Sequence, residues 1–289
     1  MKPPSFGYSR PESVSDALST LASLGPQAKV LAGGQSLLPI LSMRLAAPGH
    51  LVDINRLHEL SYVRVRDGFV RVGALARHAD VLADEPARSA QPLLAQALRL
   101  VAHATIRNRG TTVGSLVHAD PSGEMTAVLS LLGGSVRVAD ADGAREISAE
   151  QFFLGPLESA VAPGQLALEA SFPVLPALAG TAFVEVSRRH GDYAVCGVGA
   201  MIQLDGDGRV RSARAAYLSV AATPLVLDLS DAFGPTGDYV AAVARACAQV
   251  QPEADIHASA DYRRHLVGVL TERALRHARR EADGRRADG

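Results

Sequence analysis

The chain has 289 residues, of which 47% are hydrophobic and 20% are charged. Because single domains usually contain about 100–200 residues, this length predicts two or three domains and excludes a small scaffold held by disulfides. The formal net charge is −1 and no long basic block is present, which excludes sequence-independent binding of nucleic acid. No apolar run approaches the roughly 18–20 residues that a membrane span needs, so we expect no transmembrane segment.

Metal-binding patterns are missing from the sequence. The two cysteines, Cys196 and Cys247, lie far apart, and the nine histidines lack the spacing of a helical metal site. An iron–sulfur cluster or a Cys-rich zinc site therefore cannot be built from this chain alone, so a partner subunit has to supply any such group. The first six residues lack the charged and then apolar pattern of a secretory signal, so we expect a cytoplasmic protein.

The N-terminal part shows an α/β pattern. Apolar residues at helical spacing predict a helix that begins after Ser13 and ends at Gly25. The segments expected next are a strand over 28–31, a glycine loop over 32–36, a helix over 37–45 and a strand over 51–54. This order is typical of an α/β unit that presents ligands at the carboxyl ends of its strands.

The middle of the chain alternates short apolar and polar runs, which predict antiparallel strands. The turn pairs Asp67-Gly68 and Asp142-Gly143 favour two hairpins. The elements expected here are strands 62–65 and 69–72, helices 91–104 and 124–132, and strands 135–138 and 145–147.

A proline-rich stretch over 172–176 is our predicted boundary before a C-terminal domain. The elements expected beyond it are strands 182–186, 199–204 and 210–220 and helices 239–250 and 260–280. The predicted fold class is α+β. Its expected parts are a small α/β N-terminal unit (1–57), an antiparallel-sheet subdomain (58–176) and a C-terminal domain (177–289) with a three-stranded antiparallel sheet and a helical bundle.

The loop Ala32-Gly33-Gly34-Gln35-Ser36 is a candidate phosphate site. Consecutive glycines permit positive φ and a close approach of the backbone, whose amides can point together at an anion. Taken alone, the loop is equally consistent with a structural turn. A second stretch over 107–121 is rich in small and hydroxyl residues and carries two arginines. We expect this second loop to lie between helices and to close on a dinucleotide from the opposite side.

The sequence resembles the medium, FAD-binding subunits of the molybdenum hydroxylases, including carbon monoxide dehydrogenase, quinoline oxidoreductase and the flavin region of xanthine dehydrogenase. The resemblance covers essentially the whole chain and rests on four ordered matches. They are Leu31-Ala32-Gly33-Gly34-Gln35-Ser36-Leu37-Leu38-Pro39 followed by Leu51-Val52-Asp53-Ile54, the two loop motifs within 106–125, the run from Phe183 to Ala194, and Asp255-Ile256-His257-Ala258-Ser259 with Tyr262-Arg263.

The resemblance implies a set of FAD contacts and two FAD-binding subdomains. The pyrophosphate residues would be Lys29, Val30, Leu31, Ala32, Gly33, Gly34, Gln35 and Ser36 from the first loop and Gly110, Thr111, Gly114 and Ser115 from the second. Glu124 would bind ribityl or ribose hydroxyls, Val101 would lie near the ring system, and Asp192 and Tyr193 would lie beside the isoalloxazine. Two alternatives stay open: Glu124 favours a helix N-terminus in any case, and Tyr193 is also suited to ordinary packing between domains.

The resemblance also implies a function. A large partner subunit would bind the molybdopterin cofactor, a small partner would carry [2Fe-2S] clusters, and this chain's FAD would pass the electrons to an external acceptor. The expected assembly is a dimer of heterotrimers, and we expect no catalytic acid, base or nucleophile and no metal ligand in this chain. The alternatives are a self-contained flavin oxidase or dehydrogenase of the vanillyl-alcohol oxidase type, and a flavin-free assembly subunit.

One residue departs from the family's pattern. The family usually has Thr-Ile-Gly-Gly where this chain has Thr111-Thr112-Val113-Gly114. Because a β-branched residue is poorly suited to positive φ, Val113 predicts either a conventional backbone in the second loop or weaker cofactor binding. We expect FAD binding to be retained, since the first loop keeps both glycines.

Overall fold

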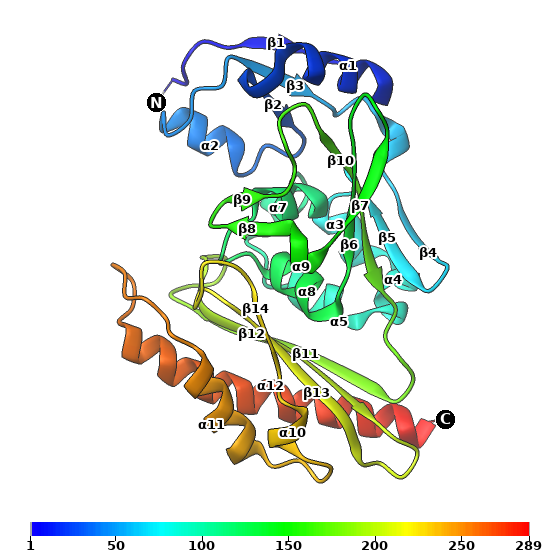
Figure 1. Cartoon of the computed structure of the whole chain (residues 1–289), viewed down its shortest axis with the longest axis vertical. Coiled ribbons are helices and arrows are strands. Elements are labelled where there is room, and N and C mark those ends of the chain that lie inside the picture. Colours follow the sequence, from blue (N-terminus) through cyan, green and yellow to red (C-terminus); the bar gives the residue numbers. More distant parts are fainter. Residues whose placement is uncertain (1, 289) are drawn as a thin grey trace.

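The structure is a computed structural model and describes residues 2–288. Figure 1 shows three parts stacked along the long axis, with the N-terminal unit at one end and the C-terminal sheet and helices at the other. No helix in these residues is long and apolar enough to cross a membrane.

The N-terminal unit is built on a three-stranded parallel sheet in the order β1-β3-β2. Its elements are β1 Gly7–Ser9, α1 Val14–Leu24, η1 Gly25–Gln27, β2 Ala28–Leu31, α2 Leu37–Ser42, β3 His50–Asp53 and η2 His58–Leu60. The side chain of Ser13 caps α1 by accepting from the Asp16 amide, and Gly25 ends the helix with φ 55°. The sequence did not predict β1, which has only three residues.

The helix expected over 37–45 is shorter than predicted, because α2 ends at Ser42. Arg44 takes a left-handed conformation with φ 59°, and its amide donates to the Leu41 carbonyl. The chain therefore turns at Arg44, before the predicted end of the helix at residue 45.

The middle part contains a five-stranded sheet in the order β4-β5-β10-β6-β7, all pairs antiparallel. Its strands are β4 Val63–Arg66, β5 Phe69–Gly73, β6 Ser135–Ala139, β7 Ala144–Ser148 and β10 Leu166–Pro173, with the small pair β8 Phe153–Gly155 and β9 Glu158–Ser159 beside it. The helices are α3 His78–Ala83, α4 Glu85–Ala90, α5 Pro92–Leu98, α6 Ala104–Arg107, α7 Thr112–His118, α8 Glu124–Leu132 and α9 Ala149–Phe152. Both predicted hairpins and the helix over 124–132 are present.

Two expectations for this part were wrong. The helix expected over 91–104 is only α5, because the chain turns through Ala102 at φ 44° before α6 begins. The stretch expected as a loop between helices contains α7, whose N-cap is Thr111. The sequence also missed α3 and α4, which have six residues each and are too short to show helical periodicity.

The C-terminal part has a four-stranded antiparallel sheet in the order β11-β12-β13-β14, one strand more than expected. Its elements are β11 Ala179–Ser187, β12 Ala194–Leu204, β13 Val210–Leu218, β14 Leu225–Asp228, α10 Ser230–Phe233, α11 Tyr239–Gln249 and α12 Ala260–Asp288. Helix α12 crosses the sheet at close range, since a Cβ at Gly180 would lie 2.1 Å from the Ala278 carbonyl oxygen (Figure 1).

Two hydrophobic cores hold these parts together. The first combines the N-terminal unit and the middle part with one face of the C-terminal sheet, to which Phe183, Ala194 and Leu218 contribute. The second fills the opposite face of that sheet, beneath α11 and α12. Because α8 also packs on β12 and β13, the segment before β12 is held against the middle part.

Candidate cofactor site

The first glycine loop joins β2 to α2 and leaves a row of backbone donors free. Among residues 2–288, the amides of Gly33, Gly34, Gln35 and Ser36 donate to no backbone acceptor. Gly34 has φ 73°, and the side-chain amide of Gln35 donates to the Gly33 carbonyl at 3.2 Å. Successive free N–H groups around a positive-φ residue form a concave anion site. The loop therefore fits a phosphate group.

The second loop lies directly against the first. A Cβ added to Gly33 would lie 2.4 Å from the Arg109 carbonyl oxygen and 2.8 Å from the Gly110 Cα. Only glycine allows this contact between two backbones. The structure thus brings the two predicted pyrophosphate loops together, although some 70 residues separate them in the chain.

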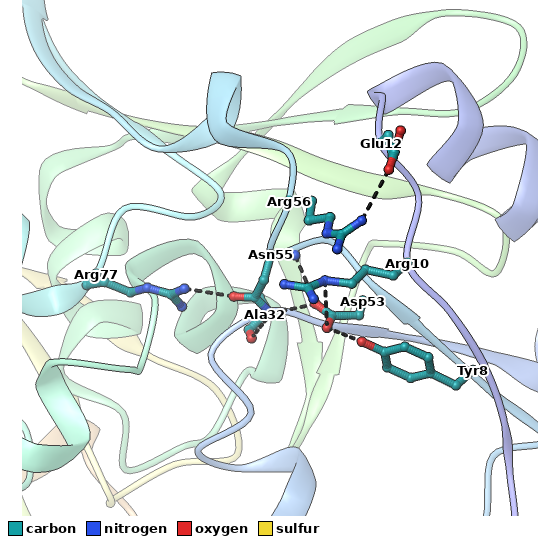
Figure 2. Close-up of polar contacts among 8 residues, drawn as sticks. All are labelled: Tyr8, Arg10, Glu12, Ala32, Asp53, Asn55, Arg56 and Arg77. Atoms are coloured by element: carbon teal, nitrogen blue, oxygen red, sulfur yellow. Dashed lines mark hydrogen bonds and ion pairs between the residues drawn. The ribbon is translucent and has the colours of Figure 1, made fainter.

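Side chains connect the two loops, and Figure 2 shows the part of this network that runs from Ala32 through Asn55 to Arg77. Asn55 donates from Nδ2 to the Ala32 carbonyl at 2.8 Å and accepts at Oδ1 from Arg77 Nη2 at 2.7 Å. Arg77 Nη1 then donates to the Arg109 carbonyl at 2.7 Å. Sequence reasoning missed both side chains. Asn55 could have been identified from its position, because it follows the strand that ends at Asp53 by two residues and so lies at the carboxyl edge of a parallel sheet.

Asp53 orients Asn55. Its Oδ1 accepts from the Asn55 backbone amide at 2.9 Å and from Asn55 Nδ2 at 2.6 Å, and its Oδ2 accepts from the Tyr8 hydroxyl at 2.6 Å. Arg10 lies 3.7 Å from the same oxygen. Burial opposes the charge on Asp53, but these hydrogen bonds and Arg10 hold its pKa below the ordinary value. The carboxylate is therefore an ionised anchor for the Asn55 amide.

The second loop is the N-terminus of α7. The Thr111 hydroxyl accepts from the Gly114 amide at 3.1 Å, and a Cβ at Gly114 would lie 2.5 Å from that hydroxyl. Val113 is helical, is 2% exposed and belongs to the first core. Positive φ is therefore not required at Val113, and its side chain points away from the loop surface. The concern that this residue weakens the cofactor site has no basis in the backbone.

The buried His78 contacts the second loop through its backbone and its ring. The His78 backbone amide donates to the Gly110 carbonyl at 2.9 Å, and its ring is 3.1 Å from the Thr112 hydroxyl. A Cβ at Gly110 would lie 3.0 Å from the ring. Burial, and then the charge of Arg107, lowers the pKa of His78 to about 4, so the ring is neutral at neutral pH.

The far end of the candidate site lies beyond α7, where the chain reaches Glu124. This residue begins α8 and is 9% exposed. Burial, and then the carboxylate of Glu185 on β11, raises the pKa of Glu124 to about 8. Burial also raises the pKa of Glu185 to about 7, and its Oε2 has no hydrogen-bond partner among the described residues. A buried and a half-buried carboxyl thus lie at the junction of α8 and the C-terminal sheet.

Asp192 and Tyr193 line a cavity of about 120 Å³ together with Ser122. The Ser219 amide donates to the Pro121 carbonyl at 2.9 Å, and its hydroxyl donates to the Ala194 carbonyl at 2.7 Å, which ties this segment to the end of the second loop. Tyr193 is 68% exposed, so its ring is open to contact rather than fully packed between domains. Asp192 accepts from Arg189 Nε at 3.0 Å, which lowers its pKa.

The remaining expected residues lie around these two ends. Val30 and Leu31 are half-buried in β2, and the exposed Lys29 on the same strand is close enough to help burial lower the pKa of His118 on α7. Ser115 is half-buried in the first turn of α7. The Val101 carbonyl accepts from Arg107 at 2.8 Å, which places this turn beside α6.

Comparison with known proteins places the chain in a family. A family model described as the FAD binding domain in molybdopterin dehydrogenase matches residues 4–175, and one described as the CO dehydrogenase flavoprotein C-terminal domain matches residues 181–278. The chain belongs to the FAD-binding medium subunits of the molybdenum hydroxylases. It is therefore an oxidoreductase subunit that binds FAD.

Relatives of known activity match over nearly the whole chain. The 6-hydroxypseudooxynicotine dehydrogenase complex subunit alpha of Paenarthrobacter nicotinovorans is 39% identical over 95% of both chains. Caffeine dehydrogenase subunit beta of Pseudomonas sp. (strain CBB1) is 38% identical over 96% of both.

Solved structures of the family agree with the fold. Carbon monoxide dehydrogenase from Hydrogenophaga pseudoflava matches with a TM-score of 0.91 at 34% identity, covering 96% of this chain and 98% of that one. Quinoline 2-oxidoreductase from Pseudomonas putida 86 also matches with a TM-score of 0.91 at 34% identity, covering 98% and 99%. Both the predicted fold class and the predicted family are confirmed.

Proposed function

We propose that this chain is the electron-transfer flavoprotein of a multi-subunit molybdenum hydroxylase. Its FAD accepts electrons from [2Fe-2S] clusters on a small partner subunit and passes them to an external acceptor, and a large molybdopterin-binding partner oxidises the substrate. The observation that carries the cofactor assignment is the row of free amides at Gly33, Gly34, Gln35 and Ser36, which lies against the second loop. FAD supplies the redox chemistry, and the chain's residues bind and orient it.

We assign the pyrophosphate to the two loops, with residues Lys29 to Ser36 from the first and Gly110, Thr111, Gly114 and Ser115 from the second. At the end of the site away from the pyrophosphate, the Glu124 carboxyl group binds ribityl or ribose hydroxyls. Asp192 and Tyr193 lie beside the isoalloxazine. An exposed tyrosine ring is suited to covering a flavin face. Val101 lies near the ring system.

The partner arrangement extends the same proposal. We propose a dimer of heterotrimers in the cytoplasm, with the chain divided at residues 57 and 176. The first division falls between β3 and η2, and the second falls between β10 and β11.

The test uses the tagged full chain purified from its own host with the partners that remain bound. We expect stoichiometric FAD after acid extraction, together with molybdenum and iron in the complex. Rapid mixing with the complex's substrate should reduce the flavin, and the chain separated from its partners should show no such reduction. A substrate that bleaches the flavin of the separated chain would support a self-contained oxidase instead, and a complex without molybdenum would contradict the proposal.

A further inference from the structure

We propose that Asn55 and Arg77 form a clasp that sets the distance between the two FAD loops, and that both act as positioning residues for pyrophosphate binding. The inference rests on the proposed roles of the two loops. Neither side chain belongs to a loop. Each reaches a loop only through a backbone carbonyl, that of Ala32 for Asn55 and that of Arg109 for Arg77.

The clasp acts on the direction of the peptide units. In a planar trans peptide, the carbonyl and the following N–H point in opposite directions. Because Asn55 holds the Ala32 carbonyl at 2.8 Å, the N–H of Gly33 points away from Asn55, towards the open side of the first loop. This N–H is the first of the free donors that fit a phosphate.

Arg77 joins this arrangement to the second loop. One arm of its guanidinium donates to Asn55 Oδ1 and the other to the Arg109 carbonyl, both at 2.7 Å. The Arg109 carbonyl is also the atom nearest to a Cβ at Gly33, so Arg77 holds the point at which the two backbones touch. A planar group with fixed donors suits this bridge better than a flexible ammonium does.

The outer part of the network keeps the clasp in one orientation. Asp53 accepts from both nitrogens of Asn55, which turns Oδ1 of the amide towards Arg77 (Figure 2). Arg77 is the N-cap of α3, and its backbone amide donates to the Asp80 carboxylate at 2.9 Å. Asn55 is therefore anchored to the last residue of β3 and Arg77 to the first turn of α3, independently of the cofactor.

Reconstitution of the deflavinated complex tests the clasp. The variants are Arg77→Met, which removes both donor arms, Arg77→Lys, which keeps the charge and at most one arm, Asn55→Ala, and the double variant Asn55→Ala with Arg77→Met. The control is Arg56→Met, because within residues 2–288 the Arg56 side chain pairs with exposed Glu12 at 3.1 Å and forms no hydrogen bond or ion pair with either loop. Dissociation constants are measured for FAD by flavin fluorescence and for ADP by competition, since ADP carries the diphosphate without the flavin.

We expect Arg77→Met and Asn55→Ala each to weaken FAD about tenfold or more and ADP by a similar factor, because one charge-assisted hydrogen bond is worth roughly that much. Arg77→Lys should recover part of the lost affinity. The double variant should bind FAD and ADP no more weakly than the single variant that has the lower affinity. The control should bind both ligands as the wild type does.

Several results would overturn the clasp while leaving the proposed function intact. These are wild-type affinity in Arg77→Met, a loss for FAD without one for ADP, or additive losses in the double variant. If Arg77→Met does not fold, Arg77→Lys and Asn55→Ala make the same comparison. A wild-type complex that takes up no FAD would contradict the proposed function itself.

Discussion

Gly33 lies so close to Arg109 that a single added methyl would stand 2.4 Å from the Arg109 carbonyl oxygen. Gly33 lies in the N-terminal unit and Arg109 in the middle part, and we assign the loops that contain them to one pyrophosphate. The cofactor site thus depends on a backbone contact that tolerates no side chain.

Replacing Gly33 with alanine should separate the loops. We expect Gly33→Ala to lose most of its bound FAD and to cost about 1–3 kcal/mol of unfolding free energy, the usual penalty of overpacking. FAD content and denaturant unfolding measure these effects. Gly206→Ala is the matched control, because nothing lies within 4 Å of a Cβ there and its φ is not positive. Full FAD occupancy in Gly33→Ala would contradict the two-loop assignment.

Val113 supports the core and not the cofactor. We expect Val113→Gly, the change towards the family's usual residue, to destabilise the protein by about 2–4 kcal/mol, since it leaves a cavity and places glycine inside a helix. The dissociation constant for FAD should stay within about threefold of wild type, a difference well below 1 kcal/mol. The stability of Val113→Ala should lie between that of the wild type and that of Val113→Gly. Tighter FAD binding in Val113→Gly would show that the valine does obstruct the site.

Glu124 should make the FAD-free protein less stable as pH rises. Its pKa is raised from 4.5 to about 8, so the folded state holds a proton that the unfolded state has released between these values. The unfolding free energy therefore falls with increasing pH across that window. Glu124→Gln should flatten this fall, and the remainder should reflect Glu185, whose pKa is about 7. Urea unfolding from pH 5 to 8 tests this, with Glu12→Gln as the exposed control, and an unchanged slope would refute it.

His78 should make the protein less stable as pH falls, which is the opposite of the effect of Glu124. Its pKa is lowered from 6.5 to about 4, so the unfolded state binds a proton that the folded state excludes between these values. Stability is present above about pH 6.5 and is lost as pH falls towards 4. We expect His78→Asn to reduce this acid sensitivity. Because His78 supports Gly110, FAD release should follow the same pH dependence in the wild type and less so in the variant. Identical acid profiles would exclude the histidine as the cause.

Arg263 on α12 hydrogen-bonds to the C-terminal sheet near Tyr193. It is 5% exposed and donates to the Val195 carbonyl at 2.6 Å, the Ser219 carbonyl at 2.7 Å and Asp255 at 2.5 Å. Arg263→Met should cost about 1–3 kcal/mol, because the Val195 and Ser219 carbonyls lose their donor. Thermal unfolding measures the loss, with Arg264→Met as the control, since the Arg264 side chain forms an ion pair with exposed Asp261. A variant as stable as wild type would show that water replaces the guanidinium.

Local sequence was sufficient wherever an element is stabilised by its own residues. Helix α1 has its cap, its apolar stripe and its terminal glycine within one short stretch, and the hairpin turns at Asp67-Gly68 and Asp142-Gly143 need only two residues each. The glycines of the first loop and the hydroxyl residues of the second were likewise visible as phosphate chemistry, and the family resemblance joined them to FAD.

Tertiary structure decided what depends on contacts between distant residues. The strands β1 and β14 are short and gain their hydrogen bonds only from neighbours already in a sheet. Val113 looked unsuitable until the structure placed it in α7 and against the core. Asn55 and Arg77 belong to no sequence motif. Their role depends on the Ala32 and Arg109 carbonyls, which come within reach of the Asn55 amide and the Arg77 guanidinium only in the folded chain. Residue type records which groups can bind a phosphate, whereas the distance between those groups is fixed only when the separate segments pack together.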